Sequence, residues 1–139
     1  MAKRVADVMT KDPVAVHWGV MLIEAAKIMR DHAIGDVLVT SNGHLCGMLT
    51  DRDIVVRAVA ENRDPYRTTV GDVCSADIVS VEPDADAHDA VELMRARAVR
   101  RVPVVESGEP VGIISMGDLA RDRDESSVLS EISKAPPNQ

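Results

Sequence analysis

Apolar residues follow two patterns along this chain, short runs and stripes with helical spacing. Runs rich in valine and leucine lie near residues 14–16, 37–40 and 45–49, and they predict short buried strands. Between the first two runs the apolar residues recur every three or four positions, which predicts an amphipathic helix. This stripe consists of Leu22, Ala25, Ala26, Met29 and Ala33. We expect Gly35 to end the helix.

A second helix and a hairpin complete this pattern. Residues 41–44, with the sequence Ser-Asn-Gly-His, are typical of a tight turn between two antiparallel strands. The next helical pattern begins at Thr50. Its apolar stripe consists of Ile54, Val55, Ala58 and Val59. A short helical turn over residues 5–9 precedes the first strand, so the expected order is β-α-β-β-α with a leading helical turn.

The whole pattern occurs twice. A shift of 65 positions aligns residues 5–53 with residues 70–118 without a gap, and 15 of the 49 aligned pairs are identical. An internal repeat of this kind predicts two copies of one structural unit. We therefore expect repeat 1 at 5–62, a polar linker at 63–69, repeat 2 at 70–124 and a tail at 125–139. A short helix is expected in this tail, over residues 127–134.

The most specific shared phrase is a glycine, two apolar residues, a hydroxyl residue, two variable positions and an aspartate. Repeat 1 has this motif at residues 47–53 and repeat 2 has it at residues 112–118. A hydroxyl residue followed three positions later by an acidic residue forms a capping box at a helix start. Taken alone the phrase predicts a helix cap, but its repetition at equivalent places indicates a pair of sites.

Charge and composition exclude several classes of function. The chain has 16 Lys and Arg against 23 Asp and Glu, a net charge of −7, which argues against general binding to nucleic acid or to anionic membranes. No apolar stretch approaches the roughly 18 residues of a membrane span, and the first residues lack the apolar run of a signal peptide. We therefore expect a cytoplasmic protein. The core is predicted to be aliphatic, because the chain has no Phe, one Trp and one Tyr.

Motifs for catalysis or metal binding are weak. Cys46 and Cys74 form no CxxC and are expected to be small buried apolar residues. His44 and Cys46 lie two positions apart on a predicted strand, which is half of a zinc site. A buried cysteine beside an exposed turn histidine is the favoured interpretation, because short motifs of this kind have many false positives. No GxSxG, P-loop or HExxH pattern occurs. We expect no enzyme and no catalytic cofactor.

The tandem repeat with its two motifs resembles the cystathionine β-synthase (CBS) domain pair. The resemblance covers residues 5–124 and is most specific at residues 47–54 and 101–105. It implies a mixed α/β (α+β) fold, two β-α-β-β-α repeats packed as one pseudo-two-fold module, here a stand-alone pair. CBS pairs are known as regulatory modules that bind adenine nucleotides or other adenosyl compounds between the repeats. They usually form flat, disc-like homodimers.

The resemblance also implies two ligand clefts, each joining the motif of one repeat to stretches of the other. Cleft A would combine Thr50, Asp53, Ile78, Val99, Arg100 and Arg101. Cleft B would combine Val14, Ile34, Gly35, Ser115 and Asp118. In this interpretation each motif aspartate accepts hydrogen bonds from ribose hydroxyls, and each Thr or Ser hydroxyl donates to a ribose or phosphate oxygen.

The two clefts are expected to differ. Arg100 and Arg101 suit phosphate oxygens, whereas Gly35 and Asp36 stand at the equivalent positions of cleft B. A phosphorylated ligand should therefore occupy cleft A first, and cleft B should stay empty or take an uncharged or cationic adenosyl compound. The alternative for the two arginines is a solvated pair bridged to surface acids.

These observations predict a regulatory module that binds AMP, ADP, ATP or S-adenosylmethionine and acts on an unknown protein partner in trans. Two alternatives remain open: a ligand-free dimeric interaction module whose motifs are only helix caps, and a metal-binding stress protein that uses His44 and Cys46. We expect the repeats to share one core and to form a homodimer through their helices. The helical residues expected near that contact are Leu22 and Met29, or Leu93 and Met94.

Overall fold

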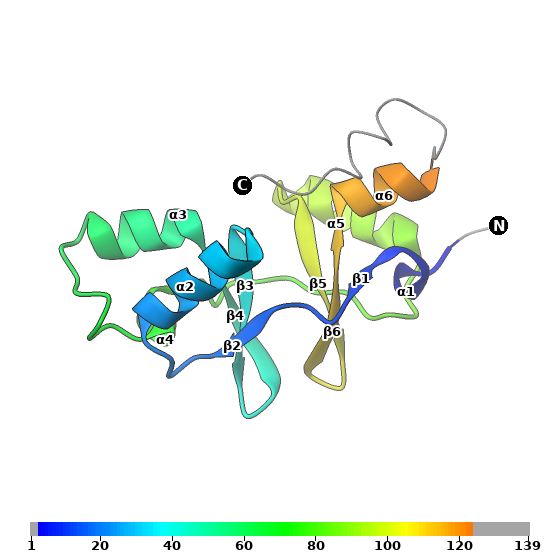
Figure 1. The fold of residues 1–139 in the computed structure, drawn as a ribbon. Coiled ribbons are helices and arrows are strands. Elements are labelled where there is room, and N and C mark those ends of the chain that lie inside the picture. The colour runs from blue at the N-terminus through cyan, green and yellow to red at the C-terminus, as the bar shows by residue number, and fades with distance from the viewer. Residues whose placement is uncertain (1–2, 124–139) are drawn as a thin grey trace. The chain divides into compact units, whose positions relative to one another are not determined.

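The computed structural model describes residues 3–123, which form a mixed α/β fold with two three-stranded sheets (Figure 1). The helices are α1 (Val5–Val8), α2 (Leu22–His32), α3 (Asp51–Asp53), the π-helix η1 (Ile54–Val59), α4 (Val70–Val73), α5 (Ala87–Arg97) and α6 (Met116–Arg123). The strands are β1 (Thr10–Lys11), β2 (Ala15–His17), β3 (Asp36–Ser41), β4 (His44–Thr50), β5 (Arg101–Glu106) and β6 (Glu109–Ser115). The predicted helix at 127–134 lies outside the described residues.

The chain divides into two compact units whose limits differ from those of the sequence repeats. One unit consists of residues 14–78, and the other joins residues 3–13 to residues 79–123. We call them the 14–78 unit and the 3–13/79–123 unit, and each is described by itself. The leading helical turn of each repeat therefore belongs to the unit that carries the sheet hairpin of the other repeat.

The 14–78 unit packs two helices on a sheet with the order β2-β3-β4. Strand β2 runs parallel to β3, and β3 runs antiparallel to β4. Figure 1 shows α2 and the helix that continues from α3 on one side of this sheet. The buried apolar residues of this unit are Val16, Leu22, Ala25, Met29, Val37, Val39, Leu49, Ala58, Val70 and Val73. They come from α2, η1, α4 and the three strands. The two predicted stripes are only partly buried, because Ala33 is exposed and Val55 and Val59 are 58% and 68% exposed.

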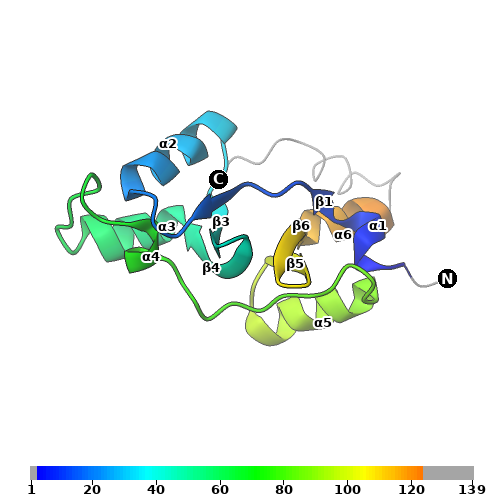
Figure 2. The ribbon, with the colours of Figure 1, turned by 90° about the horizontal axis from the view of Figure 1, so that it is seen from below.

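The 3–13/79–123 unit has a sheet with the order β1-β6-β5, in which both neighbouring pairs are antiparallel. Helix α1 contacts α5, α6 and strand β6 (Figure 2). The buried apolar residues of this unit are Val5, Ala90, Met94, Val102, Val104 and Ile114. Val5 comes from the leading turn of repeat 1, and the other five come from repeat 2.

The expectation of a single shared core is corrected by this arrangement. Each unit has its own cluster of buried residues, and each cluster is completed by the leading turn of the other repeat. Ser75 pairs with Met48 in one unit, just as Thr10 pairs with Ile113 in the other. One β-α-β-β-α repeat cannot cover its own apolar surface, and the exchanged turns supply the missing cover.

Both predicted hairpins are confirmed. Strands β3 and β4 are joined through Asn42 and Gly43, whose φ angles are 53° and 82°. Strands β5 and β6 are joined through Ser107 and Gly108, whose φ angles are 53° and 83°. Two successive residues with positive φ give a turn whose twist matches that of the flanking strands.

The predicted helix end at Gly35 is wrong. Helix α2 ends at His32, and Ala33 adopts the left-handed conformation with φ 54°. Ala98 ends α5 in the same way, with φ 54°. The backbone N–H groups of Ala33 and Ile34 donate to carbonyls in the last turn, so the chain reverses two residues before the glycine.

Two further differences concern repeat 2 and the last helix of repeat 1. The strand expected near Val81 is reduced to one parallel bridge between Val81 and Val104. The helix predicted from Thr50 begins there, but it widens into a π-helix from Ile54 to Val59. No helix in the described part of the chain is both long and apolar enough to cross a membrane.

The residues expected near a dimer contact are mostly buried inside their own units. Leu22 is fully buried, and Met29 and Met94 are 6% and 5% exposed. Leu93 is partly buried against the core of its unit. The three buried side chains offer little surface to a second copy, whereas Leu93 is less enclosed, and the dimer contact stays a prediction.

Candidate functional site

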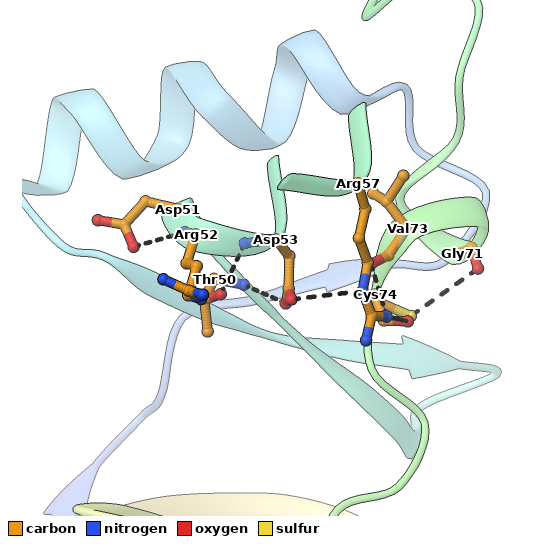
Figure 3. A network of polar contacts seen from close by, with 8 residues as sticks. All are labelled: Thr50, Asp51, Arg52, Asp53, Arg57, Gly71, Val73 and Cys74. Atoms are coloured by element: carbon orange, nitrogen blue, oxygen red, sulfur yellow. Dashed lines mark hydrogen bonds and ion pairs between the residues drawn. The ribbon is translucent and has the colours of Figure 1, made fainter. Parts of the chain in front are cut away.

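Each motif forms a complete capping box. The Oγ1 atom of Thr50 accepts a hydrogen bond from the backbone N–H of Asp53 at 3.0 Å, and Oδ2 of Asp53 accepts one from the N–H of Thr50 at 3.0 Å (Figure 3). Ser115 and Asp118 repeat both bonds, at 3.1 and 3.0 Å. The spacing predicted this geometry, because both partners lie within one helical turn. The caps engage only the Oδ2 atom of each aspartate, so the surroundings of Oδ1 distinguish the two motifs.

The Oδ1 atom of Asp53 is only loosely approached by a cation. The nearest charged group is the Nε of Arg57, at 3.9 Å. The Nη1 atom of the same guanidinium donates to the backbone carbonyls of Val73 and Cys74, at 3.4 and 3.3 Å. Figure 3 shows Arg57 reaching from the helix toward the end of α4. The side chain of Asp53 is 17% exposed, so part of this side chain reaches the surface.

Asp118 is held from both sides. Its Oδ1 atom accepts a hydrogen bond from the hydroxyl of Thr10 at 3.3 Å and another from the guanidinium of Arg121. Its side chain is only 4% exposed. Both carboxylate oxygens are therefore engaged, and the carboxylate is buried. The two motifs share a sequence pattern, but the carboxylate of Asp118 is more buried and accepts more hydrogen bonds than that of Asp53.

The residues predicted for cleft B at the start of the chain lie in the 14–78 unit. The carbonyl of Gly35 accepts a hydrogen bond from the N–H of Asp51 at 2.9 Å. Ile34 is partly buried against the core, and the carbonyl of Val14 accepts from Leu38 at 3.0 Å. This unit therefore brings Gly35 beside the Thr50 motif of its own repeat.

The residues predicted for cleft A in repeat 2 lie in the 3–13/79–123 unit. The carbonyl of Arg100 accepts a hydrogen bond from the N–H of Met116 at 3.0 Å, and Arg101 faces Ser115 across the β5–β6 pair. Val99 is 36% exposed. Ile78 is half-buried in the 14–78 unit.

Each unit thus joins a motif to the helix end and strand start of its own repeat. Thr50 and Asp53 lie in one unit and Arg100 and Arg101 lie in the other, so the two halves of cleft A belong to different units. Cleft B is divided in the same way. Both clefts, as combinations of residues from two repeats, therefore stay predictions.

The two thiols lie beside the first motif. Cys46 and Cys74 are free and half-buried. Burial raises the pKa of both thiols, and the pKa of Cys74 is raised further by Cys46 and by Asp53. His44 is exposed at the end of β4. Within residues 3–123, no group of three or more His, Cys, Asp or Glu side chains is placed to hold a metal ion.

Sequence reasoning missed three residues that surround the motif aspartates. Arg57 and Arg121 follow their aspartates by four and three positions, so an alignment of the repeats does not pair them. Thr10 is separated from Asp118 by 108 positions and reaches it only because the leading turn of repeat 1 packs in that unit. A search for basic residues one helical turn after each aspartate would have found the arginines.

Comparison with known proteins gives a consistent result. The model of the CBS domain family matches residues 5–59 and 70–125. The CBS domain-containing protein YhcV of Bacillus subtilis (strain 168) is 41% identical over 116 residues, which cover 84% of this chain and 82% of that protein.

Two solved structures are also similar. Hypoxic Response Protein I, crystallised with two coordinated zinc ions, is 35% identical, with a TM-score of 0.79 over 86% of this chain and 98% of that one. The CBS domain pair of protein MJ0100, in complex with 5′-methylthioadenosine and S-adenosyl-L-methionine, is 26% identical, with a TM-score of 0.78 over 91% and 100% of the two chains.

Proposed function

The chain belongs to the CBS domain family, and from this premise we propose that it is a regulatory module that binds an adenosyl ligand through the Thr50–Asp53 motif. Modules of this family are commonly regulatory and non-catalytic. The proposed ligand is an adenine nucleotide such as AMP, or S-adenosylmethionine, and the proposed readout is an effect on a separate protein.

The observation that carries this proposal is that the two carboxylate oxygens of Asp53 have different contacts. Oδ2 completes the helix cap, while Oδ1 lies in a side chain that is 17% exposed. A ribose hydroxyl can therefore donate to Oδ1 without breaking the capping box. Hydrogen bonds to a carboxylate are stronger than neutral ones, so this contact supplies affinity as well as orientation.

The ligand class is supported by a relative. The CBS pair of MJ0100 was solved with two adenosyl compounds, 5′-methylthioadenosine and S-adenosyl-L-methionine. For the present chain we propose AMP as the first ligand, because Arg100 and Arg101 would offer two guanidinium groups to a phosphate in cleft A. S-adenosylmethionine is the competing ligand, since it carries no phosphate.

The test is calorimetric titration of AMP and of S-adenosylmethionine into wild type, Asp53→Ala and Asp118→Ala. We expect Asp53→Ala to weaken AMP binding by at least the ~1.5–3 kcal/mol of a charged hydrogen bond. AMP binding should survive in Asp118→Ala. Equal losses in the two variants, or a loss only in Asp118→Ala, would contradict the assignment.

A matched control separates ligand binding from helix capping. Asp72 closes a capping box with Thr69 through a 3.1 Å hydrogen bond, and it faces Arg63 at 3.9 Å. Asp72→Ala therefore removes a cap and an arginine contact of the same kind in the same unit. We expect it to cost about 1 kcal/mol of stability, as for other caps, and to leave AMP affinity unchanged.

The competing function is a ligand-free interaction module, and the two completed capping boxes favour it. In that case neither AMP nor S-adenosylmethionine would bind, and Asp53→Ala would change only the free energy of unfolding.

We further propose that the module is a homodimer, that it acts in the cytoplasm on a protein partner, and that His44 and Cys46 hold no structural metal. Metal analysis of the purified protein checks the last point.

A further inference from the structure

The two motifs differ in the position of one arginine. In repeat 1 the arginine stands four positions after the aspartate, as Arg57, and Val56 fills the third position. In repeat 2 it stands three positions after the aspartate, as Arg121. The guanidinium of Arg121 hydrogen-bonds to Oδ1 of Asp118, whereas that of Arg57 remains 3.9 Å from Oδ1 of Asp53.

Local structure explains why one residue of register matters. Positions three apart on an α-helix lie on one face, so Arg121 in α6 returns directly to Asp118. Arg57 stands four positions after Asp53, within η1, and its guanidinium does not return to Oδ1 of Asp53. The carbonyls of Val73 and Cys74 hold its guanidinium at the end of α4.

The consequence for a ligand is different in the two motifs. At Asp118, hydroxyls that donate to Oδ1 must displace a guanidinium and the hydroxyl of Thr10 from a carboxylate that is 4% exposed. The Asp118 side chain is 4% exposed and that of Arg121 is 32% exposed, so a ligand hydroxyl would replace a charged hydrogen bond by a neutral one at a buried carboxylate, which is unfavourable. At Asp53 no such displacement is needed.

We propose that Arg121, together with Thr10, closes the Asp118 motif to ligand, and that the register of this arginine sets which of the two motifs is open. The inference rests on the proposed function, because it takes an adenosyl ligand at Asp53 as given. Arg121 is a specificity-determining residue in this scheme. Wild type then binds one equivalent of ligand per chain, at Asp53, although the chain carries two copies of the motif.

The experiment is calorimetric stoichiometry with AMP and, separately, S-adenosylmethionine. Wild type should bind one equivalent per chain, and Arg121→Ala should bind two equivalents of at least one probe. S-adenosylmethionine is the expected second-site probe, since it carries no phosphate. The double variant Arg121→Ala/Asp118→Ala should return to one equivalent, which assigns the new site to Asp118.

A matched control is available on α5. Arg95 forms an ion pair with Glu92 at 3.0 Å, again three positions apart, on an exposed surface of the same unit. Arg95→Ala makes the same change in charge and removes the same type of pair. It should leave the stoichiometry at one, so an increase there would attribute the effect to net charge and overturn the inference.

The reciprocal change tests the register itself and does not depend on how well Arg121→Ala folds. The double variant Val56→Arg/Arg57→Val moves the arginine of repeat 1 to the third position after Asp53. We expect AMP affinity to fall at least tenfold while circular dichroism stays that of the folded protein. Unchanged affinity in this variant overturns the inference.

The remaining outcomes separate this inference from the function on which it rests. A wild type that binds two equivalents, one lost with Asp53→Ala and one with Asp118→Ala, overturns the closure of Asp118 and leaves the proposed function standing. If folded Arg121→Ala binds only one equivalent of ligand, the closure of Asp118 is likewise overturned and the proposed function stands. A wild type that binds neither probe overturns the proposed function, and the inference falls with it.

Discussion

The glycine that begins each motif is required by a close backbone contact inside its own unit. A Cβ atom on Gly47 would lie 2.7 Å from the carbonyl oxygen of Ser75 and 3.0 Å from Sγ of Cys74. A Cβ atom on Gly112 would lie 2.6 Å from Sδ of Met9 and 2.8 Å from the carbonyl oxygen of Thr10. The exchanged leading turn approaches the strand closely at these points, so packing alone explains the glycine.

We predict that Gly47→Ala destabilises the protein by the roughly 1–3 kcal/mol of an overpacked core, because the obstructing atom is a backbone oxygen that cannot move aside. Urea unfolding followed by circular dichroism measures the change. Gly19→Ala is the control, since a Cβ there meets only the ring of exposed His17, at 3.2 Å. It should change stability by less than about 0.5 kcal/mol. Equal effects of the two changes would refute the packing explanation.

Contacts within one helical turn of the site were predictable from the sequence, and contacts between distant segments were not. The bonds between Thr50 and Asp53 follow from spacing alone, because both partners lie in one turn. The bonds from Arg57 to Val73 and Cys74 cross 16 and 17 positions, and the bond from Thr10 to Asp118 crosses 108. These contacts depend on tertiary packing, so no local sequence pattern predicts them.

At the scale of elements, the ends of the two long helices depart from the glycine rule. Ala33 and Ala98 both have φ 54°, a conformation that costs an L-residue roughly 1–2 kcal/mol. The bonds from Ala33 to Arg30 and from Ile34 to Met29 hold the reversal. The sequence offered Gly35 as the natural end, and the reversal instead occurs early enough for Ile34 to pack against the core.

This geometry leads to a prediction about helix α2. Ala33→Gly should raise the free energy of unfolding by about 0.5–1 kcal/mol, because glycine adopts positive φ without the penalty of a Cβ. Ala26→Gly, in the middle of the same helix, should lower it by about 1 kcal/mol, as glycine does in helix interiors. Chemical denaturation of the two variants measures both changes. A loss of stability in Ala33→Gly comparable to that in Ala26→Gly would contradict the proposed strain.

The hairpins were predictable for a physical reason that the helix ends lack. The two-residue turns at Asn42–Gly43 and Ser107–Gly108 require positive φ, and their sequences signal it directly. The π-helical stretch after Asp53 has no such signal, because its bonds, such as that from the N–H of Ala60 to the carbonyl of Val55, use the same apolar residues as an α-helix. The change from α-helical to π-helical hydrogen bonding after Asp53 could therefore be seen only in the structure.

At the scale of the whole molecule, the repeat predicted the architecture but not the limits of the compact units. Residues 5–53 and 70–118 align in one register, so two sheets were expected and are present, although the counterpart of β2 in repeat 2 is only a bridge at Val81. The pattern does not show that α1 and α4 pack with the hairpin of the other repeat. An alignment compares copies with each other and carries no information about which copy a segment contacts.

The exposed surface of η1 is apolar and predicts a contact between two copies of the chain. Val55, Val56 and Val59 are 58%, 46% and 68% exposed on one helix. The positions equivalent to Val55 and Val56 in repeat 2 are Ala120 and Arg121, so this apolar face belongs to repeat 1 alone. Burying a valine side chain contributes about 1.5 kcal/mol or more, and a second copy offers the same three valines in a symmetric contact.

We therefore expect light scattering to give twice the 15.0 kDa mass of one chain, and the double variant Val55→Glu/Val59→Glu to give the mass of one. Each copy has a net charge of −7, so repulsion opposes the contact and the wild-type dimer should tighten as salt is raised. Tyr66→Glu, a change at a side chain 67% exposed on the linker, is the control and should remain dimeric. A monomeric wild type, or a double variant that still dimerises, would show that η1 is not the contact.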